Sequence, residues 1–369
     1  MNPRVVFVDD EPRLLQGLRR SLYARGSTWR AEFVESAAAA LVLLEKEPCD
    51  AIVTDMQMMP MNGADLLGEV RERWPATLRF VLSGHVATES AVHALQVAHQ
   101  LLSKPCDVGV LVAAVERGIA VQNRLSTTLV RATLGRLKTL PAAPRVHARM
   151  AAALIDPQCD ARTISNILDC DPALSANVLH LANSAFFTCG GRVSSNVRHA
   201  VARIGLATVS DLVLATEVFD LNAQGPHSDA MRDRAIHASR IAAMIARGGP
   251  YGAAAPTAAL LADVGYLLPG VEEIDVSGDP ASLSAHAHAE LGASLLGLWA
   301  IPMPIVEAVA NHHAPSVNSS GFDLPGIVHV AVALASELDP DLDYLEQLGL
   351  LDNLPEWKTR SARIGIDPA

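Results

Sequence analysis

The chain is 369 residues long, which at roughly 100–200 residues per domain predicts two or three domains, each able to bury a hydrophobic core. Half of the residues are hydrophobic and 19% are charged, which excludes wholesale disorder because apolar surface is available to offset the entropy of ordering. The formal charge of -11 argues against a broad surface for duplex DNA, and the aromatic share of 4% argues against stacking platforms for single strands.

No apolar run approaches the roughly 20 residues that cross a bilayer, so we expect no membrane span. The first apolar run, Val5 to Val8, is too short for the core of a signal peptide and is followed at once by two aspartates. We therefore expect a cytoplasmic protein. The five cysteines form no Cys-x-x-Cys pair, which predicts reduced thiols rather than a disulfide framework or a structural zinc site.

Short apolar runs alternate with helical patterns over the first third of the chain, which predicts a doubly wound α/β domain with a buried parallel sheet. Leucines four residues apart mark the first helix, at Leu14, Leu18 and Leu22. The predicted strands are Val5 to Val8, Asp50 to Asp55, Arg79 to Ser83 and Gln100 to Pro105.

Polar side chains stand at the C-terminal ends of these strands, at the edge where open α/β sheets place their ligand sites. They are Asp9, Asp10, Asp55, Ser83 and Lys104. Three carboxylates suit a hard divalent ion such as Mg²⁺, and a lysine beside them suits the charge of a phosphoryl group. Phosphoryl transfer needs an in-line nucleophile, with a cation and hydrogen-bond donors around the equatorial oxygens. The pattern predicts this chemistry with Asp55 as the nucleophile.

Taken in order, these motifs resemble the receiver domain of bacterial two-component response regulators, over residues 1–122. The matching residues are Asp9-Asp10-Glu11, Thr54-Asp55 followed by Pro60 and Gly63, Ser83-Gly84, and Lys104-Pro105. The resemblance implies a five-stranded parallel sheet and a phosphoacceptor at Asp55 that is served by a histidine kinase or a phosphotransfer protein.

The resemblance also implies roles for the neighbouring residues. The implied magnesium ligands are Asp10, Asp55 and the carbonyl of Gln57, assisted by Asp9. The implied contacts of the phosphoryl group are Ser83 and Lys104. Gln57 and His85 occupy positions that tune the lifetime of the phosphoryl group in this family, and a solvated loop histidine is an equal interpretation of His85.

Two positions depart from the family pattern. Proline usually stands four residues after the phosphoacceptor, where this chain has Met59 followed by Pro60, which predicts a different loop beside the site. The position three before the lysine is commonly aromatic and is Leu101 here, so no aromatic rotamer switch is expected. These departures leave open a receiver that serves as a fixed scaffold without phosphate.

No proline interrupts the chain between Pro105 and Pro141, which predicts a helix that continues out of the first domain as a linker over residues 123–138. Basic residues recur every seven positions along it, at Arg117, Arg124, Arg131 and Lys138. Such a row favours the solvated side of a helix over a surface for an anionic partner.

The rest of the chain is rich in alanine and leucine at helical spacing, which predicts an all-helical second domain. Asp171 and Pro172 are typical of a helix N-cap followed by proline at the first helical position. The order of motifs resembles the HDOD module of bacterial signalling proteins over residues 139–340, followed by a tail over 341–369. These motifs are Leu140-Pro141, Asp171 to Ser175, Leu181 to Phe187, Ile204-Gly205-Leu206 and Leu298 to Pro302.

The HDOD module is similar in fold to HD-type phosphohydrolases, in which histidines and aspartates hold metal ions that activate water. Candidate ligands of the right type are His237, Asp263, His286, His288, His312 and His313. The paired His-Asp of those enzymes falls on Ala262 and Asp263, and alanine cannot bind a metal. We therefore expect Asp263 to lack a complete ligand set, no metal in this domain and no hydrolysis.

These observations predict a response regulator in which phosphorylation at Asp55 controls a catalytically degenerate HDOD output domain. The expected output is binding to an unknown downstream protein or formation of a homodimer, without DNA binding. An alternative remains open: an HD-type metal-dependent phosphohydrolase, or a nucleotide-binding module related to cyclic-di-GMP signalling.

Overall fold

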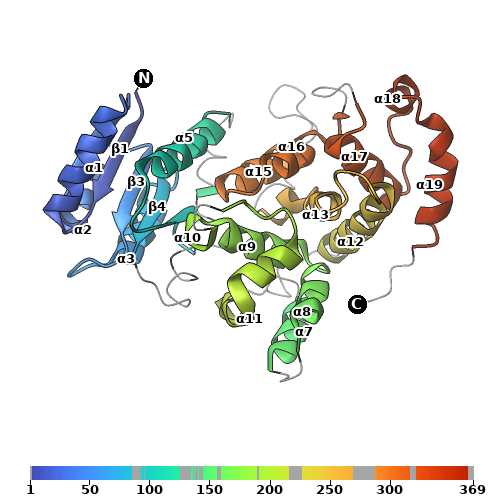
Figure 1. Cartoon of the computed structure of the whole chain (residues 1–369), viewed down its shortest axis with the longest axis horizontal. Coiled ribbons are helices and arrows are strands. Elements are labelled where there is room, and N and C mark those ends of the chain that lie inside the picture. The colour runs from blue at the N-terminus through green and yellow to red at the C-terminus, as the bar shows by residue number, and fades with distance from the viewer. Residues whose placement is uncertain are drawn as a thin grey trace. The chain divides into compact units, whose positions relative to one another are not determined.

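The computed structural model describes residues 2–84, 92, 94, 96–124, 134, 135, 137, 140, 144–155, 159–188, 191–215, 227–268, 287–315 and 321–364 (Figure 1). The chain divides into two compact units. The first comprises Met1–Lys138 with the short segments Asn183–Arg192 and Gly297–Ala300, and the second comprises Thr139–Ala182, Val193–Leu296 and Ile301–Ala369. Among the described residues, no helix combines the length and the apolar character that crossing a bilayer requires.

A five-stranded parallel sheet in the order β2-β1-β3-β4-β5 forms the centre of the first unit. Its strands are β1 (Arg4–Val8), β2 (Arg30–Val34), β3 (Ala51–Asp55), β4 (Leu78–Ser83) and β5 (Gln100–Ser103). This confirms the predicted doubly wound sheet and the four strands identified from their apolar runs. The sequence analysis missed β2, because this partly exposed edge strand carries no continuous apolar run.

The parallel register brings the ends of the central strands to one edge of the sheet. Val8 of β1 lies opposite Thr54 of β3, and Ser83 of β4 lies opposite Ser103 of β5. The residues that follow β1 and β5, and the last residues of β3 and β4, therefore gather at the same edge. This is the edge at which the polar side chains were expected to meet.

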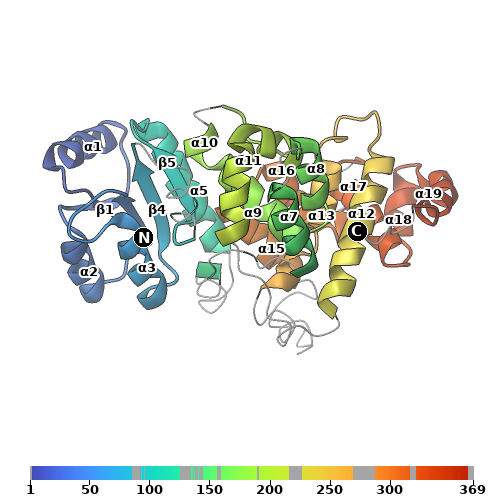
Figure 2. The same ribbon diagram turned by 90° about the horizontal axis from the view of Figure 1, so that it is seen from below.

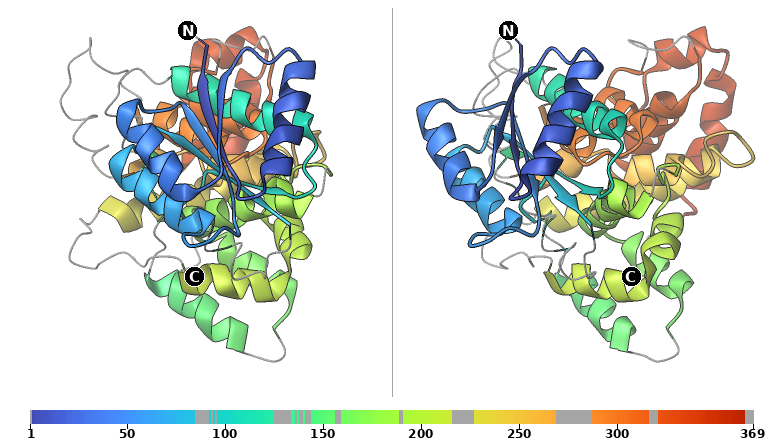
Figure 3. Two further views of the ribbon diagram at one scale, coloured as in Figure 1. Left: turned by 90° about the vertical axis from the view of Figure 1, so that its left-hand side faces the viewer. Right: turned by 60° about the vertical axis from the view of Figure 1, so that its left-hand side comes forward.

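Helices cover both faces of the sheet, as a doubly wound fold requires. They are α1 (Pro12–Ala24), α2 (Ala37–Lys46), α3 (Gly63–Arg73) and α5 (Val108–Arg124). Figures 2 and 3 show α1 and α5 on one face, with α2 and α3 on the other. Side-chain oxygens of Ser36 and Asn62 cap α2 and α3 by accepting hydrogen bonds from backbone amides of the first turn.

Gln122 near the end of α5 and the described residue Gly135 both contact the chain just before β4. The Gln122 side chain donates to the carbonyl of Ala76 (2.6 Å), and Arg79 Nη2 donates to the carbonyl of Gly135 (2.6 Å). A straight helix would separate positions 122 and 135 by about 20 Å, yet both contact the chain just before β4. A Cβ at Gly135 would lie 1.6 Å from the Pro75 carbonyl oxygen, so only glycine permits this approach. Gln122 and Gly135 therefore do not lie on one straight helix. Residues 125–133 lie outside the described residues, so the linker over 123–138 stays a prediction.

Arg79 binds Gly135 and its neighbourhood through backbone carbonyls. The side chain is 1% exposed, and it also donates to the carbonyls of Val97 (2.6 Å) and Thr77 (3.1 Å). Burial lowers the pKa of Arg79 to about 9, with a smaller effect from the charge of Arg71, so the guanidinium stays charged at neutral pH. A buried charge that is satisfied by neutral carbonyls is tied firmly to them, because losing one leaves the charge without compensation.

The second unit is helical, as predicted from its composition. Its helices are α7 (Pro144–Ile155), α8 (Ala161–Leu168), α9 (Pro172–Asn183), α11 (Val197–Ala215), α12 (His227–Ile245), α13 (Ala255–Leu260), α15 (Ala287–Leu298), α16 (Met303–Asn311), α17 (Leu324–Ala335), α18 (Leu342–Gln347) and α19 (Leu354–Ser361), with 3₁₀ turns η1 (Val264–Leu267) and η3 (Leu351–Asn353). The short α10 (Ala185–Thr188) groups with the first unit. Helix α12 packs against α13 and α17 to form the middle of this unit.

The N-terminus of α9 is held by a buried carboxylate, as the Asp171-Pro172 pattern predicted. Asp171 Oδ1 accepts a hydrogen bond from the amide of Leu174 (2.9 Å), and Oδ2 lies 3.3 Å from Nε of Arg232 on α12. Neither side chain has any exposed surface. One carboxylate therefore caps α9 and also pairs with α12, which fixes the two helices to each other.

Asn177 of α9 binds the backbone of Leu140 with both ends of its amide. Its Oδ1 accepts from the Leu140 amide (3.1 Å), and its Nδ2 donates to the Leu140 carbonyl (2.8 Å). Both residues are buried, so these two hydrogen bonds satisfy backbone groups that water does not reach. Asn177 thus anchors the start of the helical unit to its most buried helix.

We expect Asn177→Ala to lower the free energy of unfolding of the helical unit by roughly 2–4 kcal/mol, because two buried backbone groups lose their partners. The matched control is Asn166→Ala on α8, where the side chain is exposed and the effect should stay within about 0.5 kcal/mol. Urea unfolding followed by circular dichroism measures both. Equal midpoints for the two variants would show that the Asn177 hydrogen bonds do not stabilise this unit.

Candidate functional site

Lys104 lies between two carboxylates at the C-terminal edge of the sheet. Its Nζ is 2.7 Å from Oδ2 of Asp9, which follows β1, and 2.6 Å from Oδ1 of Asp55, which ends β3. Both carboxylates are buried, and the lysine is about three-quarters buried. Burial alone would lower the pKa of Lys104, but its hydrogen bonds to Asp55 and Asp9 raise the pKa above its ordinary value. The ammonium group is therefore firmly charged and holds the two strand ends together.

Backbone amides orient the same two carboxylates. Asp9 Oδ1 accepts from the amide of Glu11 (2.9 Å), and Asp55 Oδ2 accepts from the amide of Gln57 (3.2 Å). Each carboxylate thus has one oxygen on a backbone N–H and the other on Lys104. This arrangement fixes both side chains before any ligand arrives, which lowers the cost of organising the site.

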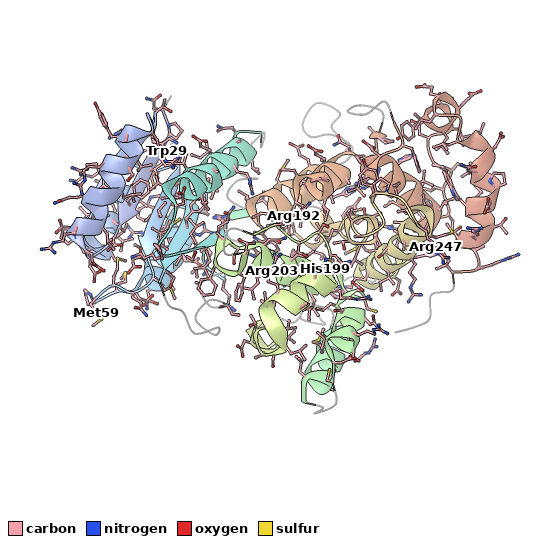
Figure 4. All side chains as sticks on the ribbon, in the orientation of Figure 1. Trp29, Met59, Arg192, His199, Arg203 and Arg247 are labelled. Atoms are coloured by element: carbon pink, nitrogen blue, oxygen red, sulfur yellow. The ribbon has the colours of Figure 1, made fainter. Side chains whose placement is uncertain are left out.

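The loop after Asp55 turns tightly back against its own strand. The amide of Gly63, the first residue of α3, donates to the carbonyl of Met56 (3.0 Å), and a Cβ at Gly63 would lie 2.0 Å from the Asp55 carbonyl oxygen. Glycine is therefore required here for steric reasons. Met59, at the tip of the loop, is 82% exposed and extends away from the sheet in Figure 4.

Three acidic side chains of this edge could hold a metal ion. One carboxylate oxygen from each of Asp9, Asp10 and Asp55 lies within 4.8 Å of the other two, with Asp10 exposed and the others buried. Oxygen donors of this charge suit Mg²⁺, which keeps several of its waters and takes few protein ligands. The residues therefore fit the ion that the sequence analysis expected, and the Gln57 carbonyl as a further ligand stays a prediction.

Ser83 brings a buried hydroxyl to the end of β4. Its side chain is 1% exposed, and its Oγ has no hydrogen-bond partner among the described residues. A buried hydroxyl without a partner costs about 1–3 kcal/mol, so this group is poised for a ligand oxygen. His85, the other residue predicted beyond β4, lies outside the described residues. Leu101 is fully buried in β5, where the related family carries an aromatic side chain.

A second polar cluster surrounds Asp263 in the helical unit. Oδ1 of Asp263 lies 3.6 Å from Nε2 of His288 and 3.6 Å from Nε2 of His312, and His313 Nε2 lies 3.0 Å from His288 Nε2. Helix α15 and the end of α16 thus bring histidines beside Asp263, and the expected incomplete ligand set stays a prediction. His237 lies elsewhere, with its Nε2 3.3 Å from the carbonyl oxygen of Ser361. His286 lies outside the described residues.

One ring nitrogen of His312 faces this carboxylate. His312 Nδ1 lies 2.7 Å from the carbonyl oxygen of Val309. Nε2 is buried without a hydrogen-bond partner among the described residues. A cation between Nε2 and the carboxylate would give both groups a partner. Two ligands of a tetrahedral ion with bonds of ~2.1 Å lie about 3.4 Å apart, which is close to the 3.6 Å that separates Nε2 from Asp263 Oδ1.

Arg234 already neutralises the other side of the Asp263 carboxylate. Its Nε and Nη2 lie 3.1 and 3.0 Å from Oδ2. Burial would raise the pKa of Asp263, but His312, Arg234 and His288 together hold it well below its ordinary range. The carboxylate therefore stays charged, with Oδ2 occupied by the guanidinium and Oδ1 turned towards the histidines.

Comparison with known proteins assigns a family to each part of the chain. A family model for the response regulator receiver domain matches residues 5–116, and the HDOD domain model matches residues 140–270. The HDOD match includes Asp263 and ends before the three histidines.

Individual relatives match the receiver region. The hydrogenase transcriptional regulatory protein HoxA of Cupriavidus necator is 35% identical over 120 residues, which cover 32% of this chain and 24% of HoxA. The photosynthetic apparatus regulatory protein RegA of Rhodovulum sulfidophilum is 32% identical over 114 residues, 31% of this chain and 61% of RegA. A signal receiver domain of an HD domain-containing protein from Pseudomonas fluorescens Pf-5 aligns with a TM-score of 0.32 and 25% identity, over 34% of this chain and 100% of that domain.

The chain thus spans about a quarter of the length of HoxA and under two thirds of RegA, so the activities in those names describe those proteins. The two family matches together cover most of the described chain, in the order that the motifs indicated. The chain carries a response regulator receiver domain followed by an HDOD domain.

Proposed function

We propose that Asp55 accepts a phosphoryl group from a histidine kinase or phosphotransfer protein, and that this event controls the HDOD domain. The observation that carries the proposal is the position of Lys104, whose Nζ contacts both Asp9 and Asp55 at hydrogen-bond distance. An oriented carboxylate, a fixed ammonium and the unsatisfied Ser83 hydroxyl are the groups that phosphoryl transfer requires from a protein.

In the transfer, a carboxylate oxygen of Asp55 attacks phosphorus and forms the O–P bond while the P–N bond to the donor histidine breaks. The nucleophile is already ionised, so no base is needed to remove a proton from it. Mg²⁺ held by Asp9, Asp10 and Asp55 would supply positive charge for the phosphoryl oxygens when bound. Lys104 offers an ammonium to the same oxygens, and Ser83 offers its O–H.

Phosphorylation would change the partners of Lys104. The Asp55 carboxylate becomes a mixed anhydride, which removes one of the two anions that the lysine holds, and the added phosphoryl group brings its own negative charge. Lys104 and Ser83 would then turn to the phosphoryl oxygens and shift an equilibrium between receiver conformations. Leu101 in place of an aromatic residue means that this shift does not use a swinging ring.

We also propose that the HDOD domain acts without catalysis, through binding to a downstream protein or through dimerisation, and that it extends to about residue 340. The support is Ala262, which stands where HD-type enzymes place the histidine that pairs with their metal-binding aspartate. Without that ligand a two-metal centre of the kind that activates water for hydrolysis is incomplete.

The phosphoacceptor role predicts a response to beryllofluoride with Mg²⁺, which mimics a phosphoryl group on aspartate. We expect this mixture to change the mass or hydrodynamic radius of the wild-type chain in light scattering, and Asp55→Asn to abolish the change. Asp65→Asn, an exposed aspartate on α3, is the control and should respond like the wild type. A wild-type chain that binds the mimic without any change in mass or radius would contradict control of assembly by phosphorylation.

The bridging role of Lys104 predicts a metal-dependent stability. Lys104→Met leaves the Asp9 and Asp55 carboxylates without their cation. We therefore expect the free energy of unfolding to fall by roughly 1–3 kcal/mol in the presence of EDTA. Saturating Mg²⁺ should restore most of this loss, and thermal unfolding with and without Mg²⁺ measures it. Lys104→Arg keeps the charge and should lose less stability than Lys104→Met. An equal rise in unfolding temperature with Mg²⁺ for the wild type and both variants would argue against the bridge.

The cluster around Asp263 favours a second candidate function, the binding of one transition-metal ion. His288, His312 and His313 each bring one ring nitrogen within 4.8 Å of the other two, and Asp263 Oδ1 lies 3.6 Å from the first two. These are donors of the kind that Zn²⁺ or Fe²⁺ takes. The observation behind it is the buried Nε2 of His312, which faces the carboxylate without a hydrogen-bond partner among the described residues.

We expect a metal site here to give about one Zn, Mn or Fe per chain in elemental analysis of the purified protein. His312→Gln should reduce this content to background, and His237→Gln should leave it unchanged because His237 lies outside the cluster. A purified wild type without such a metal, and without uptake when Zn²⁺ is supplied, would favour the non-metal HDOD domain that the sequence indicated.

A further inference from the structure

A cavity of about 550 Å³ lies in the receiver domain between the sheet and the helices α1 and α5. Phe7, Val53 and Leu82 of the strands form its floor. Side chains of α1 and α5 form its apolar walls, among them Leu14, Leu18 and Leu111. The space is partly open to solvent and forms a groove that a ligand could enter from outside.

The cavity remains open because Gly17 of α1 contributes no side chain to its wall. Gly17 lines the cavity, and a Cβ built on it would meet no heavy atom within 4 Å. Glycine in the middle of a helix costs about 0.5–1 kcal/mol relative to alanine, and no steric contact demands it at this position. Leu14, on the same wall, is 45% exposed, so an apolar surface at the opening stays accessible to a ligand.

The volume matches a small organic ligand. Pockets for such ligands measure roughly 300–1,000 Å³ and combine apolar walls with a few polar groups. At about 30 Å³ per heavy atom, similar to the volume of a water molecule in the liquid, the cavity holds roughly 18 heavy atoms. A saturated chain of about ten carbons fits within this space, whereas a phospholipid does not.

One end of the cavity carries positive charge. Arg13 lines it and forms no ion pair in the part of the chain that the structure describes. Lys104 lines it too, between its two carboxylate partners Asp9 and Asp55. The helices α1 and α5 both begin at this end, and the partial positive charge of a helix N-terminus adds to that of the side chains. Because Lys104 is already held by two carboxylates, Arg13 is the cation of the lining that an incoming anion meets without a competing partner.

We propose that this cavity binds an amphipathic monocarboxylate, with its apolar tail beneath α1 and its carboxylate on Arg13 and Lys104. Because Lys104 also belongs to the phosphoacceptor site, the ligand and the phosphoryl group compete for the same ammonium. Ligand binding therefore opposes phosphorylation and gives the receiver a second, chemical input. The regulatory part of this inference rests on the proposed function of Asp55, and the binding site does not.

The probe for binding is decanoate, measured by isothermal titration calorimetry on the full chain below the concentration at which decanoate forms micelles. We expect one site on the wild type and on Asp55→Asn. Gly17→Leu should fill the cavity and abolish binding. The matched control is Gly68→Leu on α3, another helical glycine with no heavy atom within 4 Å of an added Cβ, which does not line the cavity and should bind as the wild type does.

The role of the charged end is tested by a second pair of measurements. Arg13→Gln should weaken decanoate binding about fivefold to tenfold, which corresponds to one lost charge-assisted hydrogen bond, and leave the binding of neutral decanol unchanged. Absence of binding to the wild type, or equal binding to Gly17→Leu, would overturn the site. If Arg13→Gln lowers the affinity for decanoate and for decanol equally, the assignment of a carboxylate ligand is overturned.

Competition is measured by repeating the titration with beryllofluoride and Mg²⁺. We expect decanoate to bind several-fold more weakly to the wild type under these conditions and with unchanged affinity to Asp55→Asn. An unchanged wild-type affinity, with the mimic confirmed to be bound, would overturn the regulatory part. If the mimic does not bind Asp55 at all, the proposed phosphoacceptor fails instead, and the titrations without the mimic still decide the cavity.

Discussion

The parallel register of the central strands is the constraint on which the receiver site depends. Because β1, β3, β4 and β5 run in one direction and end at one edge, residues far apart in the chain meet there without any further adjustment. Lys104 completes this edge by contacting the carboxylates that follow or end two other strands. The ion pairs, the amide contacts and the charged end of the cavity all follow from this register.

The receiver site and the cluster around Asp263 share one electrostatic arrangement, in which a basic side chain is paired with a buried carboxylate. Lys104 contacts Asp9 and Asp55 in the receiver, and Arg234 contacts Asp263 in the helical unit. In each case a further group stays unsatisfied, the Ser83 hydroxyl or the His312 imidazole. Charges that are paired at rest remain ionised, and the neighbouring polar atom provides a place for an incoming ligand.

Arg79 ties a residue beyond α5 to the chain just before β4. Its guanidinium donates to the carbonyl of Gly135, and the same buried side chain donates to the carbonyls of Val97 and Thr77. Gly135 is therefore part of the packing of the first unit. These buried hydrogen bonds hold segments together that are far apart in the sequence, because each carbonyl compensates a charge that water does not reach.

The amino-acid sequence alone was sufficient for features that depend on short stretches of chain. The buried strands, the all-helical second half, the Asp171 cap and the ordered polar residues of the receiver follow from periodicity and residue type within a few positions. Tertiary packing decided the rest. The edge strand β2 depends on its neighbour for pairing, Gly135 is held by Arg79 from a distant part of the chain, and Asp263 acquires its histidines from α15 and the end of α16. The cavity beneath Gly17 and the bridge made by Lys104 likewise arise only when distant segments meet, and no local pattern records such distances.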